Sequence, residues 1–324
     1  MDKKRLLHSV FFLFIGIGIF WWVFRDTDLD NLVSELRKVK WSWIAISLAL
    51  NLVSLAIRAL RWKSLFIPID YKPHTFNLFL SKVVLAFTNQ IIPRGGEIAR
   101  LGVVRKTDRV PFAILFGTAL VERLTDLVIL LMIFIALVIW KFELFVKILH
   151  LPEISLQNLD LQTTLVIAGI AAIVMVAAVT VVRKFNLFEK FRAKLSKFKF
   201  DVKKGFTSLR HVENKTLYFT LSVLYYVTTF FMFYILFFAL PATSGLSFSA
   251  AVFTFGVATL AFLLPIQAGI GAWHFLVIQC LLLFGIDSET GKAFSLIAHA
   301  ATNLVNIPLG AIAFGILAFR RNRT

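Results

Sequence analysis

The residues best suited to chemistry lie between positions 89 and 100, in the run N-x-x-x-P-R-G-G-E-x-x-R. Proline and two glycines break a helix and leave backbone N–H groups free at the start of the next helix, which suits an anion such as a lipid phosphate. The arginines would add charge-assisted hydrogen bonds, and the glutamate would act as their counter-ion or bind a cationic headgroup. The alternative is an ordinary cytoplasmic loop whose arginines follow the usual charge bias of such loops. The predicted phosphate-binding and helix-breaking residues are Asn89, Pro93, Arg94, Gly95, Gly96, Glu97 and Arg100.

A second group, Glu122, Arg123 and Asp126, interrupts an otherwise apolar run. A charged side chain near the middle of a bilayer costs about 2.5–3.5 kcal/mol on insertion scales, so such residues face a partner or a polar cavity and are candidates for function. Arg123 and Asp126 are three positions apart and can pair on a helix, and Glu122 shares a face with Asp126. The alternative is a structural network of ion pairs that locks helices together.

Arg58 and Arg61 share a helical face with Trp62 at the end of another apolar run. Their guanidinium groups could hold a lipid phosphate through paired hydrogen bonds. The equally good alternative is an interfacial anchor, in which the arginines and the tryptophan sit at the level of the lipid headgroups.

Two further polar positions, His274 and Asn303, belong to the predicted polar cavity. His274 follows a Pro/Gly-rich break and is the one titratable group near it, although a lone histidine in such a place is more often a packing residue. Asn303 shares a face of the last apolar run with His299 and Asn306. Hydrogen bonding between helices is the preferred explanation of this polar face.

The patterns typical of enzymes and cofactor sites are missing. The sequence has no G-x-S-x-G elbow, P-loop or Rossmann fingerprint. Its single cysteine, Cys280, excludes a disulfide framework, and its six histidines form no H-x-x-x-H pair. We therefore expect no catalytic residue, no metal site and no cofactor. Nucleic-acid binding is not expected either, because the basic residues do not form one face of a soluble domain with stacking aromatics.

The elements that must position these residues are membrane helices. Of the 324 residues, 59% are hydrophobic and 16% are charged, and the mean hydropathy is +0.82. A soluble domain usually has about 25% charged residues, so this chain has too little polar surface for water. We expect an all-α integral membrane protein with about six to eight transmembrane helices. The apolar runs lie at about 6–24, 41–65, 76–92, 98–104, 111–140, 161–182, 217–240, 250–265, 271–286 and 293–319, with an amphipathic, interfacial segment at 28–40.

The net charge of +17 is concentrated in short stretches between the apolar runs. Residues 183–216 contain eleven Lys or Arg and form the strongest cytoplasmic marker, a linker between an N-terminal membrane half, 1–182, and a C-terminal half, 217–324. Because cytoplasmic loops are rich in Lys and Arg, the N-terminus, this linker and the C-terminal RRNR are predicted to lie in the cytoplasm. The predicted location is the cytoplasmic membrane of a prokaryote.

This orientation predicts two re-entrant hairpins that enter from opposite faces of the membrane. The basic residues on both sides of 76–104 place both ends of this segment inside, with PRGGE at its tip. Residues 250–286 must begin and end outside, with their break at 265–271, where Pro265, Gly269 and Gly271 interrupt the helix. Two broken segments in corresponding positions of two halves indicate an inverted-repeat transporter with its site near the midplane.

Four motifs together resemble one known family. They are R-x-x-R-W at 58–62, the run at 89–100, E-R-x-x-D at 122–126 and P-x-x-x-G-x-G at 265–271. In their order and spacing the chain resembles, from about residue 8 to residue 318, the transmembrane region of lysylphosphatidylglycerol synthase, a family that includes stand-alone flippase-like proteins. The resemblance implies lipid translocation, which in the bifunctional members means moving an aminoacylated phospholipid outward.

Two departures narrow what the resemblance implies. The bifunctional members carry a cytoplasmic aminoacyl-transferase domain after this region, whereas this sequence stops at Thr324, so lysine transfer by this chain alone is not expected. The family often has an acidic residue shortly after the G-x-G that ends the motif at 265–271, where this chain reads Ala272, Trp273 and His274. An aminoacylated lipid is therefore one substrate class beside polyprenyl-linked and glycosylated lipids.

The sequence predicts a flippase-like protein that moves an anionic, aminoacylated or glycosylated lipid between leaflets. Its expected partners are membrane lipids, with a lipid-modifying transferase or glycosyltransferase as a further candidate, and an oligomer fits as well as a monomer. Two alternatives remain: an integral membrane enzyme that uses Glu97 or Glu122 as a base, and a membrane subunit of such a transferase.

Overall fold

The computed structural model describes residues 3–69, 71–92, 95–148, 215–263 and 266–321, and every regular element in this part of the chain is a helix. The run at 161–182 and positions 183–214 of the basic linker lie outside the described residues. So do Pro93, Arg94 and Pro265, three of the predicted site residues. The division of the chain into two halves therefore stays a prediction.

Within the part of the chain that the structure describes, four helical segments are long and apolar enough to cross a membrane. Along them, large apolar side chains point outward, as Met132 and Ile139 of α6 do with 65% and 74% of their surface exposed. Such an outer surface fits lipid rather than water, which confirms an all-α, multi-pass membrane protein. The segments are α3 (Trp41–Ser64) with the short η1 (Ile67–Ile69), α6 (Phe112–Trp140), α11 (Lys215–Ile235) with η3 (Leu236–Ala239), and α14 (Ser288–His299) continuing through η6 (Ala300–Leu304) into α15 (Asn306–Arg321).

Two helices precede these spans, α1 (Lys3–Phe24) and α2 (Leu29–Arg37). The carboxylate of Asp28 caps α2 by accepting the N–H groups of residues 30 and 31. Leu29 and Val33 remain exposed beside the buried Leu32. The predicted amphipathic helix is therefore confirmed, and its place in the membrane interface stays a prediction.

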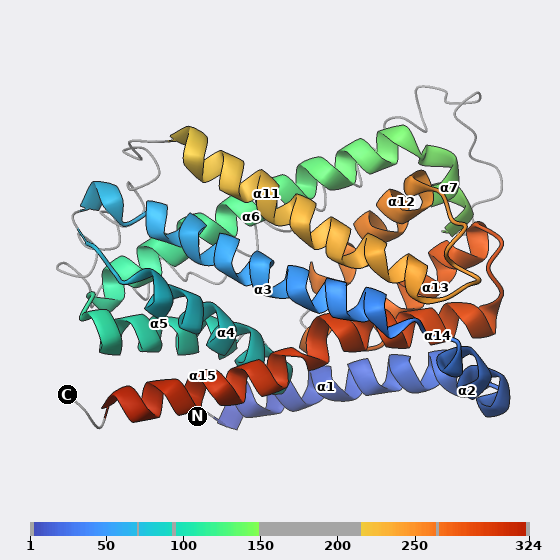
Figure 1. Cartoon of the computed structure of the whole chain (residues 1–324), viewed down its shortest axis with the longest axis horizontal. Coiled ribbons are helices and arrows are strands. Elements are labelled where there is room, and N and C mark those ends of the chain that lie inside the picture. The colour runs from blue at the N-terminus through green and yellow to red at the C-terminus, as the bar shows by residue number, and fades with distance from the viewer. Residues whose placement is uncertain (1–2, 70, 93–94, 149–214, 264–265, 322–324) are drawn as a thin grey trace.

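Two helix hairpins enter the bundle from opposite ends of its long axis, as Figure 1 shows. In the first hairpin, α4 (Thr75–Ile91) runs to the middle of the molecule and α5 (Gly95–Asp108) returns beside it. The second hairpin runs inward through α12 (Phe248–Thr259) and returns through α13 (Ala272–Leu283), with the short η4 (Leu260–Leu263) and η5 (Gln267–Gly269) around its break. The end of α4 contacts η5, so the tips of the two hairpins meet.

Several of the connections that carry basic residues gather at one end of the bundle, the left end in Figure 1. The C-terminal ends of α3 and α15, the α5–α6 connection and the start of α11 all lie there. Helix α2 and the short α7 (Phe142–Ile148) lie at the opposite end. The sequence placed the same basic connections on one side of the membrane, and the arrangement agrees with that grouping.

The second hairpin turns through backbone that few residues adopt. Ala268, Gly269 and Gly271 have φ angles of +47°, +70° and +81°. A side chain at Gly271 would also meet the backbone of α1, because its Cβ would lie 2.5 Å from the carbonyl oxygen of Gly16. Two of the three predicted breaking residues, Gly269 and Gly271, thus have the conformation that glycine adopts at no steric cost.

The first hairpin depends on Gly96, and Gly96→Ala is expected to destabilise the protein by about 1–3 kcal/mol. An added Cβ would collide with the carbonyl oxygen of Leu85 and with the side chain of Asn89. Gly102→Ala is the matched control on the same helix, because a Cβ there meets nothing within 4 Å. Thermal unfolding in detergent should show a lower midpoint for Gly96→Ala only. Equal midpoints would contradict the tight contact.

Candidate functional site

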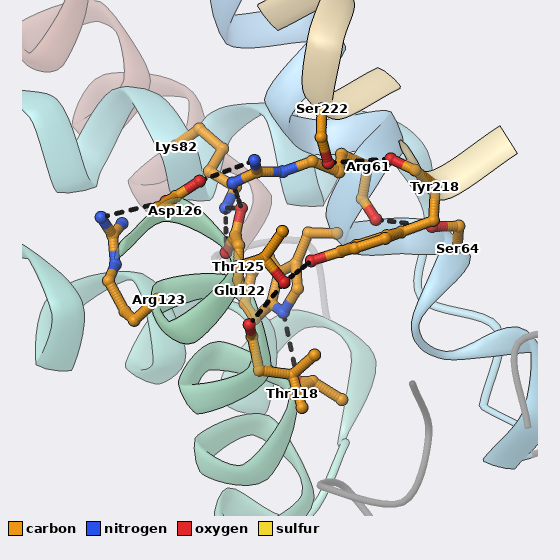
Figure 2. A network of polar contacts seen from close by, with 12 residues as sticks. Arg61, Ser64, Lys82, Thr118, Glu122, Arg123, Thr125, Asp126, Tyr218 and Ser222 are labelled. Atoms are coloured by element: carbon orange, nitrogen blue, oxygen red, sulfur yellow. Dashed lines mark hydrogen bonds and ion pairs between the residues drawn. The ribbon is translucent and has the colours of Figure 1, made fainter. Parts of the chain in front are cut away.

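The centre of the candidate site is the carboxylate of Glu122, which three cationic side chains surround; Figure 2 labels two of them, Arg61 and Lys82. Its Oε1 accepts hydrogen bonds from Lys82 Nζ at 2.7 Å and Arg61 Nη2 at 3.1 Å. Its Oε2 accepts from Arg100 Nη1 at 2.5 Å and again from Lys82 at 2.8 Å. All four residues are fully buried. Each comes from a different helix, α3, α4, α5 or α6, so Glu122 ties the first hairpin to two long spans.

The cluster continues to an exposed edge through two more carboxylates. Asp126 accepts from Arg61 Nη1 at 2.7 Å and lies 3.5 Å from Arg123 Nη1. Glu97 pairs with Arg123 Nη2 at 2.6 Å and with Arg100 Nε at 2.8 Å. The side chains of Arg123 and Glu97 are 42% and 30% exposed, whereas those of Arg61, Lys82 and Arg100 are not exposed at all. A ligand can therefore reach the cluster at the Glu97–Arg123 pair.

Aromatic rings line the buried side of the cluster. Lys82 Nζ and Arg100 Cζ lie 4.7 and 4.4 Å from the centre of the Trp62 ring, and the indole N–H donates to Thr118 at 3.1 Å. The guanidinium groups of Arg58 and Arg61 both lie 5.4 Å from the Tyr225 ring. Cations over aromatic faces gain electrostatic stabilisation where water is excluded. The rings hold the cations in place without neutralising them.

The cluster has more positive than negative charge when every group is in its ordinary ionised state. Four cations, Arg61, Lys82, Arg100 and Arg123, face the three carboxylates Glu97, Glu122 and Asp126. Arg58 adds a fifth cation beside Tyr225.

Three buried guanidinium nitrogens at this cluster also lack a hydrogen-bond partner among the described residues. They are Arg58 Nε, Arg61 Nε and Arg100 Nη2. A buried donor without an acceptor costs about 1–3 kcal/mol, and more when it belongs to a charged group. Together with the excess of positive charge, these free donors favour the binding of an anion.

A second polar group lies where the two hairpin tips meet. His299 Nε2 is 2.9 Å from the carbonyl oxygen of Ala268, and the His274 and His299 ring centres are 4.5 Å apart. Gln90, in the last turn of α4, donates to Asn303 Oδ1 at 3.3 Å. The predicted hydrogen bonding between helices is thus confirmed for Asn303. The π-helix η6 follows His299 directly, and such a widened turn is often found at functional sites.

The structure brings together most of the predicted site residues that it describes. The charge cluster unites Arg61, Glu97, Arg100, Glu122, Arg123 and Asp126, with Arg58 at its margin, whereas His274 and Asn303 belong to the second group. Asn89 caps the first hairpin, because its Oδ1 accepts the N–H of Gly96 at 2.9 Å. That N–H is therefore already used inside the protein, and the Gly95 N–H donates to Ile92.

Sequence reasoning missed Lys82, which donates to both oxygens of Glu122. Its signal in the sequence is a single lysine inside the apolar run 76–92. Like any charged side chain at membrane depth, such a lysine is expected to face a partner or a polar cavity. Tyr225 was missed as well, and an aromatic residue in an aromatic-rich helix gives no such signal.

Comparison with known proteins places this arrangement in a family. The UPF0104 membrane protein MJ1595 of Methanocaldococcus jannaschii is 24% identical over 337 residues of alignment, which cover 98% of this chain and 97% of the relative. No solved structure matches the chain. The family model described as the lysylphosphatidylglycerol synthase TM region matches residues 9–310, so that nearly the whole chain, including both hairpins and the charge cluster, falls within it. The chain belongs to the lysylphosphatidylglycerol synthase TM region family.

Proposed function

We propose that this protein moves lipids with an anionic headgroup between the two leaflets of the membrane, and that the charge cluster holds the headgroup phosphate. The observation that carries the proposal is the buried excess of positive charge around Glu122, with three guanidinium nitrogens that lack a hydrogen-bond partner among the described residues. Membership of a family named for a lipid synthase supports a lipid as the ligand.

The geometry suggests how a phosphate would enter. A phosphate cannot cross the hydrocarbon core without replacements for its hydrogen bonds to water. At the exposed edge it would displace Glu97 from Arg123 and Arg100, which now hold that carboxylate at 2.6 and 2.8 Å. The released Glu97 would remain beside the headgroup, where it favours a lipid that also carries an ammonium group.

The two hairpins provide the elements that would open the site to one leaflet at a time. Entering from opposite ends of the bundle, they fit a pair of re-entrant segments with inverted orientation (Figure 1). In such folds the substrate site lies between the broken segments, and rocking of one part against the other alternates access. The basic end of the bundle would face the cytoplasm, because Lys and Arg are retained on that side.

The test is leaflet exchange of fluorescent lipids in liposomes that contain the purified protein. Arg123→Gln should slow exchange at least about tenfold, because a charge-assisted hydrogen bond contributes about 1.5–3 kcal/mol. Arg25→Gln is the matched control, since Arg25 is an exposed arginine that pairs with the adjacent Asp26. The lipid panel should include anionic, zwitterionic, aminoacylated and polyprenyl-phosphate species.

Either of two outcomes would contradict the proposal. If folded wild-type protein exchanges no lipid of the panel, the membrane-subunit and enzyme alternatives become the better explanations. If Arg123→Gln exchanges lipid as fast as wild type, the phosphate is not held at the exposed edge of the cluster.

A further inference from the structure

The contact between the two hairpin tips holds a pair of histidines that the phosphate site does not use. His274 begins the return helix α13, and His299 ends α14 just before the π-helix. The two imidazole rings have centres 4.5 Å apart. His274 is buried, and its Nδ1 has no hydrogen-bond partner among the described residues. A buried imidazole nitrogen without a partner is an open position for a proton or a donor.

Aromatic side chains pack against this histidine pair. From α1, Phe20 and Phe24 place their rings edge-on to His274, at 5.2 and 5.8 Å. Trp273 lies 5.5 Å from His299. The polar partner that the structure gives to the pair is the carbonyl oxygen of Ala268.

Among the side chains that the structure describes, the charged groups on the elements packed against the pair are exposed or paired elsewhere. Glu289 and Lys292 of α14 lie near the opposite end of that helix and pair with each other at 2.8 Å. Arg25, after the end of α1, is exposed and pairs with Asp26, and Glu143 of α7 is exposed. On α2, Glu35 pairs with Lys38. Helix α12 and the short η4 and η5 contain no ionisable residue.

Two neutral imidazoles this close take up one additional proton at most. A second proton would put two like charges next to each other among aromatic rings, and no carboxylate among the described neighbours offsets even the first. The added proton would therefore be bound more tightly when water reaches the pair than when the rings are buried, as in this conformation.

The pair is also fixed to the parts that must move if the hairpins separate. His299 contacts the carbonyl oxygen of Ala268, whose backbone has the left-handed φ of +47°. Non-glycine residues in this conformation are held there by their surroundings. The hydrogen bond from Gln90 to Asn303 joins η6, which follows His299, to the first hairpin. Opening of either hairpin would pull these contacts apart and let water reach the imidazoles.

We propose that the His274–His299 pair is a binding site for a single proton, taken up from water when one hairpin opens and released to water on the other side when the other opens. The proton binds at an imidazole nitrogen and leaves from it unchanged, so no other reactant is needed. The proton site stands on the geometry of the pair, whereas its coupling to lipid movement rests on the proposed function.

The test begins with a direct count of protons. Nitrogen-15 spectra of histidine-labelled protein in liposomes, recorded across a pH series, should show one proton shared by the two rings. His274→Gln and His299→Gln should each abolish the uptake of this proton by the pair, because Gln does not titrate. At position 299 the Gln amide can still donate to the carbonyl oxygen of Ala268. His74→Gln is the control, since His74 caps α4 in the loop after η1 and lies outside the pair. Two independent protons, or none, would overturn the proposal.

A second measurement separates this inference from the proposed function. An imposed pH gradient should change the lipid exchange rate of wild type and of His74→Gln at least about threefold, but should leave His299→Gln unaffected. A gradient effect that survives in His299→Gln would overturn the coupling. If no protein exchanges lipid while the shared proton is present, the proton site is supported and the proposed function is the one that fails.

Discussion

Glu122→Gln is expected to destabilise the folded protein by about 3–5 kcal/mol, although it changes one atom. Glu122 is the shared counter-ion of Arg61, Lys82 and Arg100, all fully buried. An amide would leave three buried cations facing a neutral group. Its NH₂ group, a hydrogen-bond donor, would also face the N–H donors of these cations, where the carboxylate oxygen now accepts. Because the four residues belong to four helices, the substitution should loosen the first hairpin from α3 and α6.

Thermal or denaturant unfolding in detergent, with the yield of folded protein, measures this effect. Glu289→Gln is the matched control, because Glu289 pairs with one partner, Lys292, three residues away and is partly exposed. It should change stability by less than about 1 kcal/mol. The double variant Lys82→Met with Glu122→Gln should recover part of the loss, because it removes one of the uncompensated cations. A Glu122→Gln protein as stable as wild type would show that the carboxylate is not the link between the helices.

The fold was largely predictable because lipid imposes simple rules on a sequence. Each apolar run inside the described residues became a helix, and the Pro/Gly breaks at 93–96 and 265–271 separate the helices of the two hairpins. The charge bias grouped the basic connections, and Figure 1 places them at one end of the bundle. These signals are local, so a single sequence displays them. The sequence alone could not show that the two hairpin tips touch, because that contact joins positions about two hundred residues apart.

The members of the charge cluster other than Lys82 were predictable, but their pairing was not. Glu122, Arg123 and Asp126 were identified by the cost of charge in a membrane, and Arg61 by its place at the end of a span. The sequence left open whether the acidic group locks helices or binds a ligand. The structure separates two parts of the cluster: Glu122 is sealed among cations, whereas Glu97 and Arg123 form the exposed edge. Which arginine meets which carboxylate depends on helix rotation, and periodicity does not determine that.

This division makes the two ends of the cluster experimentally separable. A residue of the sealed part should affect stability and transport together, because its loss disturbs the helices themselves. A residue of the exposed edge should affect transport more than stability, since exposed ion pairs contribute little to folding. Arg100 joins the parts, because Nη1 contacts Glu122 and Nε contacts Glu97. Its substitution should therefore resemble that of Glu122 rather than that of Arg123.

Trp62→Ala is expected to have the second large effect, a loss of about 3–5 kcal/mol in the free energy of unfolding. Trp62 is completely buried, and its ring lies against Lys82 and Arg100. Truncation to alanine would leave a cavity beside two buried cations and remove the N–H that donates to Thr118. The loss therefore combines packing, cation–π attraction and the hydrogen bond to Thr118, whose hydroxyl keeps its bond to the carbonyl oxygen of Leu115.

Two further variants divide this loss into its parts. Trp62→Phe keeps an aromatic face for Lys82 and Arg100 but removes the hydrogen bond to Thr118, so it should retain most of the stability. Trp41→Ala is the control for tryptophan removal in general, because Trp41 begins α3 with 73% of its surface exposed. If Trp62→Phe unfolds as readily as Trp62→Ala, neither the packing of the ring nor its face over the cations stabilises the cluster, and the lost hydrogen bond to Thr118 explains the effect. A large gap between the two variants would instead show that an aromatic ring at this position, through its packing and its face over Lys82 and Arg100, carries most of the stabilisation.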